Sequence, residues 1–166
     1  MSDEFVTAAR DASLDEGWTL VFVREFRQAP AVVWAALTEP GQLDQWAPFT
    51  AVRDLGTAGP TTLTMGDEQT PAVVLRAEAP SLLEYSWGDD RLRWELSPHG
   101  AGTQLILRHT LSRPGMAAMV AAGWHLCADV LARLLDGRPV GVIRGSAAMD
   151  HGFEELRQAY AKLLGI

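Results

Sequence analysis

The chain has 166 residues, of which 48% are hydrophobic and 21% charged, and its formal net charge is -7. This length suits one domain, and the composition is that of a folded globular protein rather than a disordered chain. The negative charge, without any cluster of Lys or Arg, argues against nucleic acids and anionic lipid surfaces as partners. Neither a signal peptide nor a membrane span is expected, because residues 1–10 carry acids and no apolar run reaches spanning length.

The first predicted element is a strand over residues 18–27, in which Trp18, Leu20 and Phe22 alternate with polar side chains. Pro30 then begins a helix of about three turns that Pro40 ends. A second short helical turn follows at residues 41–46. Two short helices are therefore expected directly after the first strand.

Six more strands are predicted after these helices, separated by turns rich in Gly, Pro and Asp. They lie at about 49–55, 61–65, 72–78, 82–87, 91–97 and 103–111. Links this short require antiparallel neighbours, because a parallel crossover needs about a dozen residues or more. The sequence thus predicts an antiparallel meander.

Helical periodicity replaces strand alternation after Pro114. A long helix from Met116, with an unusually wide apolar face, is predicted to end at Gly137 and Pro139. The single cysteine, Cys127, falls in this apolar run and is expected to be a core residue. A last helix at about 147–164 should pack outside the sheet or along the long helix. One cysteine excludes an internal disulfide, and we expect a reducing cytoplasm.

Three strands are predicted to direct alternate side chains toward the long helix. These series are Leu83, Tyr85 and Trp87; Leu92, Trp94 and Leu96; and Leu105, Leu107, His109 and Leu111. Together with Trp124, Met116 and Met119 of the helix they predict an aromatic and sulfur-rich wall, which is typical of adaptable small-molecule pockets. For any one of these residues, plain core packing is the simpler explanation.

Gly123 and His109 are the two positions that favour a pocket over a solid core. Gly123 falls at the centre of the apolar helix face, where its missing side chain leaves room for a neighbouring Trp or for a ligand. His109 ends a leucine series and needs a hydrogen-bond partner when buried, either a backbone carbonyl or a ligand group. Tyr85 is a second candidate donor.

A metal site and the common catalytic motifs are not expected. His125 and Asp129 share one helix face, but that face is opposite the apolar one, and Arg133 is placed to pair with Asp129. No nucleophile elbow, phosphate loop, dinucleotide fingerprint or zinc-hydrolase pattern occurs. No cofactor is therefore predicted. An enzyme that needs only a shaped pocket and one or two acid/base groups would leave no motif.

Landmarks along nearly the whole chain from Trp18 onward match a known family. They are Arg24-Glu25-Phe26, Ala29-Pro30, Val33-Trp34, Leu37-Thr38-Glu39-Pro40, Leu43, Trp46, Gly102-Thr103, Leu105, Leu107, His109, Gly123-Trp124, Phe153, Leu156 and Tyr160. The sequence resembles homologues of the C-terminal domain of the activator of the 90-kDa heat-shock protein ATPase. That family lies in the START or SRPBCC superfamily.

The resemblance implies an α+β helix-grip fold, as in the birch-pollen allergen, with a curved seven-stranded antiparallel sheet around the long helix and an extra terminal helix. Residues 1–17 would be an N-terminal extension, and residues 18–166 the one START-like domain. It also implies a hydrophobic cavity between sheet and helix. Chaperone activation has little support, because residues 1–17 are too few for a separate partner-gripping domain.

Our leading hypothesis is therefore the binding of a small apolar or aromatic molecule, such as a lipid or polyketide, in that cavity. The predicted ligand-binding residues are Trp87, Trp94, Leu107, His109, Met119, Gly123 and Trp124. One alternative is a cyclase- or hydratase-like enzyme that uses His109 and Tyr85 as acid/base groups. Another is a co-chaperone or protein-interaction module, in which the cavity is incidental.

Overall fold

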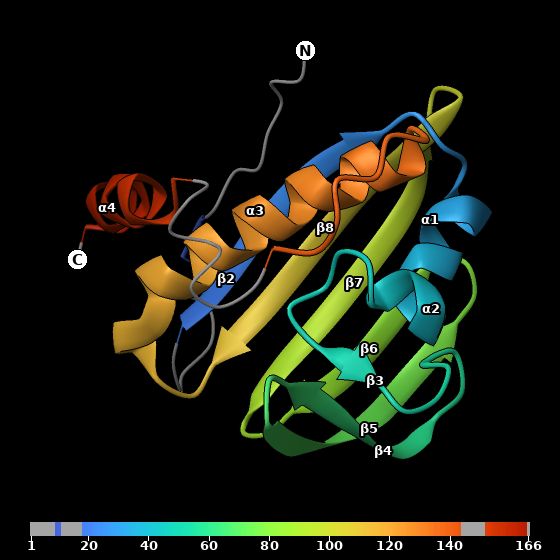
Figure 1. The fold of residues 1–166 in the computed structure, drawn as a ribbon, viewed down its shortest axis with the longest axis horizontal. Coiled ribbons are helices and arrows are strands. Elements are labelled where there is room, and N and C mark those ends of the chain that lie inside the picture. Colours follow the sequence, from blue (N-terminus) through green and yellow to red (C-terminus); the bar gives the residue numbers. More distant parts are fainter. Residues whose placement is uncertain (1–8, 11–17, 144–151, 166) are drawn as a thin grey trace.

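A curled antiparallel sheet holds the long helix α3 (Ala117–Leu135) against its concave face in the computed structural model (Figure 1). The structure describes residues 9–10, 18–143 and 152–165. The strand order is β1-β2-β8-β7-β6-β5-β4-β3, and neighbouring strands run antiparallel. The strands are β1 (Ala9–Arg10), β2 (Trp18–Phe26), β3 (Thr50–Ala51), β4 (Gly59–Met65), β5 (Glu68–Glu78), β6 (Leu82–Trp87), β7 (Asp90–His99) and β8 (Gly102–Leu111).

All seven predicted strands are present, and the helix-grip arrangement is confirmed. The strand predicted at 49–55 is correct only for Thr50–Ala51. Beyond it the chain forms a loop, in which Arg53 donates hydrogen bonds to the carbonyl oxygens of Asp54 and Thr57. The two-residue strand β1 was not predicted. It pairs with β2 and adds an eighth strand inside the segment expected to be only an extension.

Helices α1 (Pro30–Thr38) and α2 (Pro40–Leu43) cover one end of the sheet, between β2 and β3. Pro30 begins α1, as predicted from the fixed φ of proline. Pro40, expected only to end the first helix, also begins α2, which stops at Leu43 and is shorter than the turn predicted at 41–46. Trp46, just beyond α2, is buried and donates its indole N–H to the Ala36 carbonyl at 2.9 Å. This hydrogen bond connects the segment after α2 to α1 and holds both helices against the core.

The register of β6, β7 and β8 places the predicted inward side chains in layers. One layer contains Leu83, Trp94 and Leu107, which are paired across the three strands. The next layer contains Tyr85 and Leu92 beside His109. All six are buried, so the prediction that they point inward from the sheet is confirmed.

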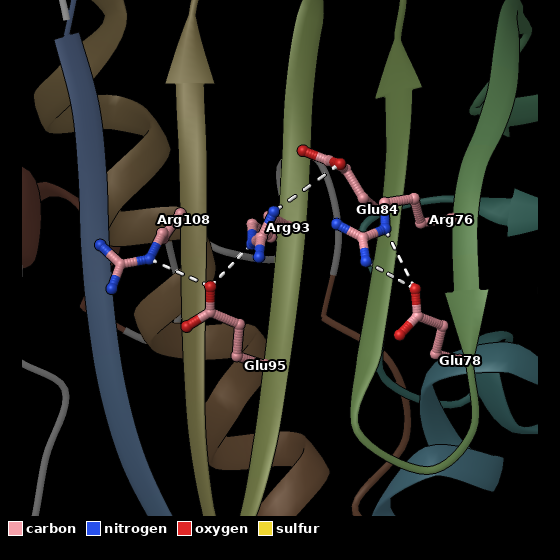
Figure 2. A network of polar contacts seen from close by, with 6 residues as sticks. All are labelled: Arg76, Glu78, Glu84, Arg93, Glu95 and Arg108. Carbon is pink, nitrogen blue, oxygen red and sulfur yellow. Dashed lines mark hydrogen bonds and ion pairs between the residues drawn. The ribbon is translucent and has the colours of Figure 1, made fainter.

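Charged side chains occupy the opposite, convex face of the sheet (Figure 2). Arg93 of β7 lies 2.7 Å from Glu95 on the same strand and 3.9 Å from Glu84 on β6. Arg108 on β8 also contacts Glu95, and Arg76 pairs with Glu78 on β5. Because these side chains remain at least partly exposed to solvent, each pair stabilises the fold by about 1 kcal/mol or less. The hydrophobic core therefore lies on the concave side alone.

Helix α4 (Phe153–Leu164) packs along α3, one of the two positions predicted for it. Its predicted start near residue 147 lies outside the described residues. By length and composition α3 could cross a membrane, with a mean hydropathy of 1.4, so the expectation that no apolar run reaches that length was wrong. Here its apolar side instead packs against the sheet and α4, as the core helix of this fold.

A candidate ligand-binding cavity

A cavity of about 550 Å³ opens beside the first half of α3. Its mouth lies at the end of the sheet where the β4–β5 turn, the β6–β7 turn and the segment from β8 to α3 come together. Lining residues lie in or beside each of these three connections: Met65 and Glu68, then Gly88 to Asp90, then Ser112, Arg113 and Met116. The cavity thus lies between sheet and helix, as expected, but toward one end of the sheet.

The inner wall of the cavity is mainly apolar. Trp87 and Leu111 line it from the sheet, Val120 from α3, and Phe153 from α4. Gly123 lies between them, and a Cβ atom added there would meet nothing within 4 Å. The sequence left two possibilities for the space beside Gly123, a neighbouring Trp or a ligand. No Trp side chain fills it. The space is open.

His109 is almost fully buried at the inner end of this cavity, with both ring nitrogens engaged. The Trp124 indole N–H donates to Nδ1 at 2.8 Å, so Nδ1 carries no proton. The proton is therefore on Nε2, which donates to Asp90 Oδ2 at 2.7 Å. Neither a backbone carbonyl nor a ligand is needed to satisfy this ring, contrary to both options raised from the sequence.

Asp90, the first residue of β7, is the site residue that the sequence did not reveal. Its Oδ1 accepts hydrogen bonds from the Ser112 backbone N–H at 2.9 Å and from Ser112 Oγ at 2.7 Å. Burial alone would raise its pKa, but hydrogen bonds from His109 and Ser112 outweigh burial and lower the pKa below its ordinary value. Asp90 is therefore a carboxylate at neutral pH.

The arrangement of these groups suits recognition rather than nucleophilic catalysis. Ser112 donates to Asp90 and not to a histidine, so it does not form the Ser-His pair of a hydrolase nucleophile. His109 has no free nitrogen with which to accept or deliver a proton. What remains available is one acceptor site on Asp90 Oδ2, because a carboxylate oxygen accepts about two hydrogen bonds and only one is made here.

Trp94, Leu107 and Tyr85 do not line this cavity. Trp94 and Leu107 border a separate space of about 30 Å³ under α3, which has room for about one water molecule. Tyr85 is buried and accepts a hydrogen bond from the Trp94 indole at 3.1 Å. Burial raises the pKa of Tyr85 far above its ordinary value, so the acid/base role considered for Tyr85 has no support in its position.

The remaining predicted ligand-binding residues, Trp87, His109, Met119, Gly123 and Trp124, meet in the cavity wall. Edge-to-face ring contacts connect Trp124 to His109 and to Trp94, with centroids 6.1 and 5.4 Å apart. These contacts pack the three rings together at the inner end of the cavity. The inward-facing residues predicted from strand alternation are therefore divided. Some line the open cavity, and the others lie in the packed core beneath it.

His125 and Asp129 have partners that the sequence did not indicate. Asp129 pairs with Arg24 of β2 at 2.8 Å rather than with Arg133, and His125 Nδ1 lies 2.8 Å from the Tyr160 hydroxyl of α4. This face of α3 therefore contacts β2 and α4, while Asp129 keeps a side-chain exposure of 37%. Within the described part of the chain, no group of three His, Cys, Asp or Glu side chains is placed to hold a metal ion.

Residues 27–136 match the family described as activator of Hsp90 ATPase homolog 1-like protein. The chain belongs to this family. No curated protein matches the sequence. The family match spans both short helices, the sheet from β3 to β8 and all of α3, and therefore includes most of the cavity wall.

Solved structures share the fold of this family member. CalU16 from Micromonospora echinospora has a TM-score of 0.72 at 23% identity, with 96% of each chain covered. The protein DynU16 of the dynemicin biosynthetic locus has a TM-score of 0.68 at 22% identity, with 80% of this chain and 52% of that one covered. An AHSA1-like protein from Aeromonas hydrophila has a TM-score of 0.61 at 18% identity, with 72% of this chain and 92% of that one covered.

Proposed function

We propose that this protein binds a small apolar or aromatic molecule in the cavity beside Gly123. The observation that carries the proposal is the open space of about 550 Å³, which lies within the range of about 300 to 1,000 Å³ typical of small-molecule sites. Its wall combines aromatic and thioether groups with a small polar end at Asp90, which is the usual composition of such sites.

Three methionines at the mouth support the same proposal. Met65, Met116 and Met119 line the cavity, and their exposed fractions are 42%, 39% and 44%. Large apolar side chains gathered at one opening are unusual on a monomer unless something covers them. Methionine adapts its shape to different partners, so these side chains fit a ligand whose outer part reaches the mouth.

The contacts of His109 and Tyr85 argue against these two residues as the acid/base groups of the cyclase- or hydratase-like alternative. A general acid or base must reach the substrate with a free nitrogen or oxygen. His109 has both nitrogens occupied by Asp90 and Trp124, and Tyr85 lies outside the cavity. The cavity thus offers shape and one anchoring carboxylate, which is sufficient for a binding protein.

Titration of intrinsic Trp emission tests the proposal. Trp87 and Trp124 line the cavity, so occupancy should change their emission in a saturable way. The ligand panel should contain fatty acids, flavonoids and polyketides; similarity to a protein of the dynemicin biosynthetic locus favours adding products of such loci. If no compound in the panel gives a saturable change, the proposed function is wrong.

A further inference from the structure

We propose that the ligand carries a protonated amine beside its apolar body, and that this cation binds Asp90 Oδ2. The inference rests on the proposed function, because it concerns the chemistry of the same cavity. It is carried by the hydrogen bonds around Asp90 and by the charges that line the mouth.

Asp90 is held in place by the protein and still has capacity for a ligand. Its Oδ1 takes two donors from Ser112, while Oδ2 takes a single donor, His109 Nε2. The side chain is 23% exposed, and it lines the cavity. Because Asp90 lines the cavity, the second acceptor site of this ionised oxygen is available to a donor on the ligand.

The charges around this oxygen favour a donor that is positive. Three carboxylates line the cavity, those of Glu68, Asp89 and Asp90, against one guanidinium, that of Arg113. His109 adds no charge, since Trp124 donates to its Nδ1. Among the described residues no ion pair connects Arg113 to Asp90. A cleft with this excess of negative charge, in a chain of net charge -7, attracts cations.

The neighbouring rings add a second attraction for a cation. Trp87 is half-buried in the cavity wall, and its ring centroid lies 6.3 Å from that of His109, which contacts Asp90. An ammonium group bound at Asp90 would thus lie near an indole, the best aromatic partner for a cation. A neutral hydroxyl would gain neither this contact nor the charge assistance of the carboxylate.

Calorimetric titration with three naphthalene derivatives tests the inference: naphthylmethylamine, naphthylmethanol and naphthoate. They share the apolar body and differ in the charge of one substituent. We expect the amine to bind about tenfold more tightly than the alcohol, because a charge-assisted hydrogen bond is stronger than a neutral one by roughly 1.4 kcal/mol. Naphthoate should bind most weakly.

The variant Asp90→Asn should remove the preference for the amine over the alcohol, because the neutral amide no longer offers an ionised oxygen to the ammonium group. Glu84→Gln on the convex face is the matched control: it alters the net charge equally, away from the cavity, and should keep the preference. The double variant Glu68→Gln with Asp89→Asn leaves the Asp90 hydrogen bonds intact and should reduce the preference even if Asp90→Asn fails to fold.

The outcomes separate this inference from the proposed function. Equal binding of amine and alcohol would overturn the inference that the ligand is a cation. So would an unchanged preference in the double variant when Asp90→Asn is unfolded. Either result leaves the proposed binding function standing. Absence of binding by all three compounds, together with a silent Trp titration against the wider panel, would overturn the function itself. A preference lost in both cavity variants and kept in Glu84→Gln supports the inference.

Discussion

Gly123 has no side chain at the point where α3 borders the cavity, and this makes it the most direct test of the open space. An alanine there meets no atom within 4 Å and removes the conformational cost of glycine in a helix. We expect Gly123→Ala to raise the free energy of unfolding by about 0.5–1 kcal/mol in urea titrations.

The larger variant Gly123→Leu should fill the space instead. We expect this variant to fold and to bind the ligand at least about tenfold more weakly. The Leu side chain would displace apolar contact between ligand and cavity wall, and contact of this size contributes more than about 1.4 kcal/mol. Gly123→Ala serves as its control. Unchanged affinity in Gly123→Leu would show that the ligand binds elsewhere.

Trp124 has a second role beside lining the cavity, because its indole N–H satisfies the buried His109 Nδ1. Trp124→Phe keeps most of the ring but leaves that nitrogen without its donor. We expect a loss of about 1–3 kcal/mol in the free energy of unfolding. Trp87→Phe is the control, since no hydrogen bond of the Trp87 indole is found in the described structure. Equal losses in both variants would contradict the role assigned to Trp124.

The residues of the site could be predicted only in part. Gly123, Met119, Trp87 and Trp124 were found because strand alternation and helix periodicity say which way a side chain faces. Asp90 was missed because it follows Gly88 and Asp89 in what reads as an ordinary hairpin turn. Its role depends on β7–β8 register, which brings it beside a histidine 19 residues away, and no local pattern encodes that.

At the scale of elements, α4 is fastened to α3 by a contact that responds to pH. Tyr160 is buried on α4, and its hydroxyl contacts His125 Nδ1. Burial lowers the pKa of His125 below 6.5; Asp129 opposes this effect and Arg24 adds to it. Burial, reinforced by Asp129 and opposed by Arg24, raises the pKa of Tyr160 to about 12, so this hydroxyl keeps its proton and can donate.

Because the pKa of His125 is lower in the folded state, the unfolded chain takes up a proton first as the pH falls. The stabilising contribution is complete above pH 6.5 and is lost as the pH falls from there through the folded pKa. We therefore expect the free energy of unfolding to decrease between pH 7 and pH 5.5, measured by denaturant titration. In His125→Gln the free energy of unfolding should lose the part of its pH dependence that His125 causes and keep the part that the carboxylates cause. Identical slopes would refute the assignment.

Element prediction succeeded where the signal was local and failed where it was not. The alternation in β6 to β8 and the period of α3 indicated both the elements and their buried faces. β3 ends early because Arg53 binds carbonyl oxygens of the following loop, which is a contact that alternation cannot show. The partner of Asp129 was wrongly expected within α3, because the true partner, Arg24, comes from a distant strand.

For the whole molecule, binding in a preformed cavity should stabilise the fold by mass action. At a free ligand concentration of one hundred times Kd the gain is about 2.7 kcal/mol. For a domain of this size that corresponds to a rise in Tm of roughly 5–10 °C, which differential scanning calorimetry would measure. Gly123→Leu should show no such rise. A ligand that gives the same rise in this variant is not bound in the cavity.

The mouth is built largely from connections, while the floor beneath it is built from regular structure. Met65, Glu68 and Asp89 stand on or beside hairpin turns, whereas Trp87, Leu111 and Gly123 belong to strands and α3. Turns tolerate sequence change far better than the elements they join. Substitutions in the turns can therefore change ligand selectivity while the protein still folds. Grafting the β4–β5 and β6–β7 turns of another family member onto this fold is a direct way to change which ligand the cavity prefers.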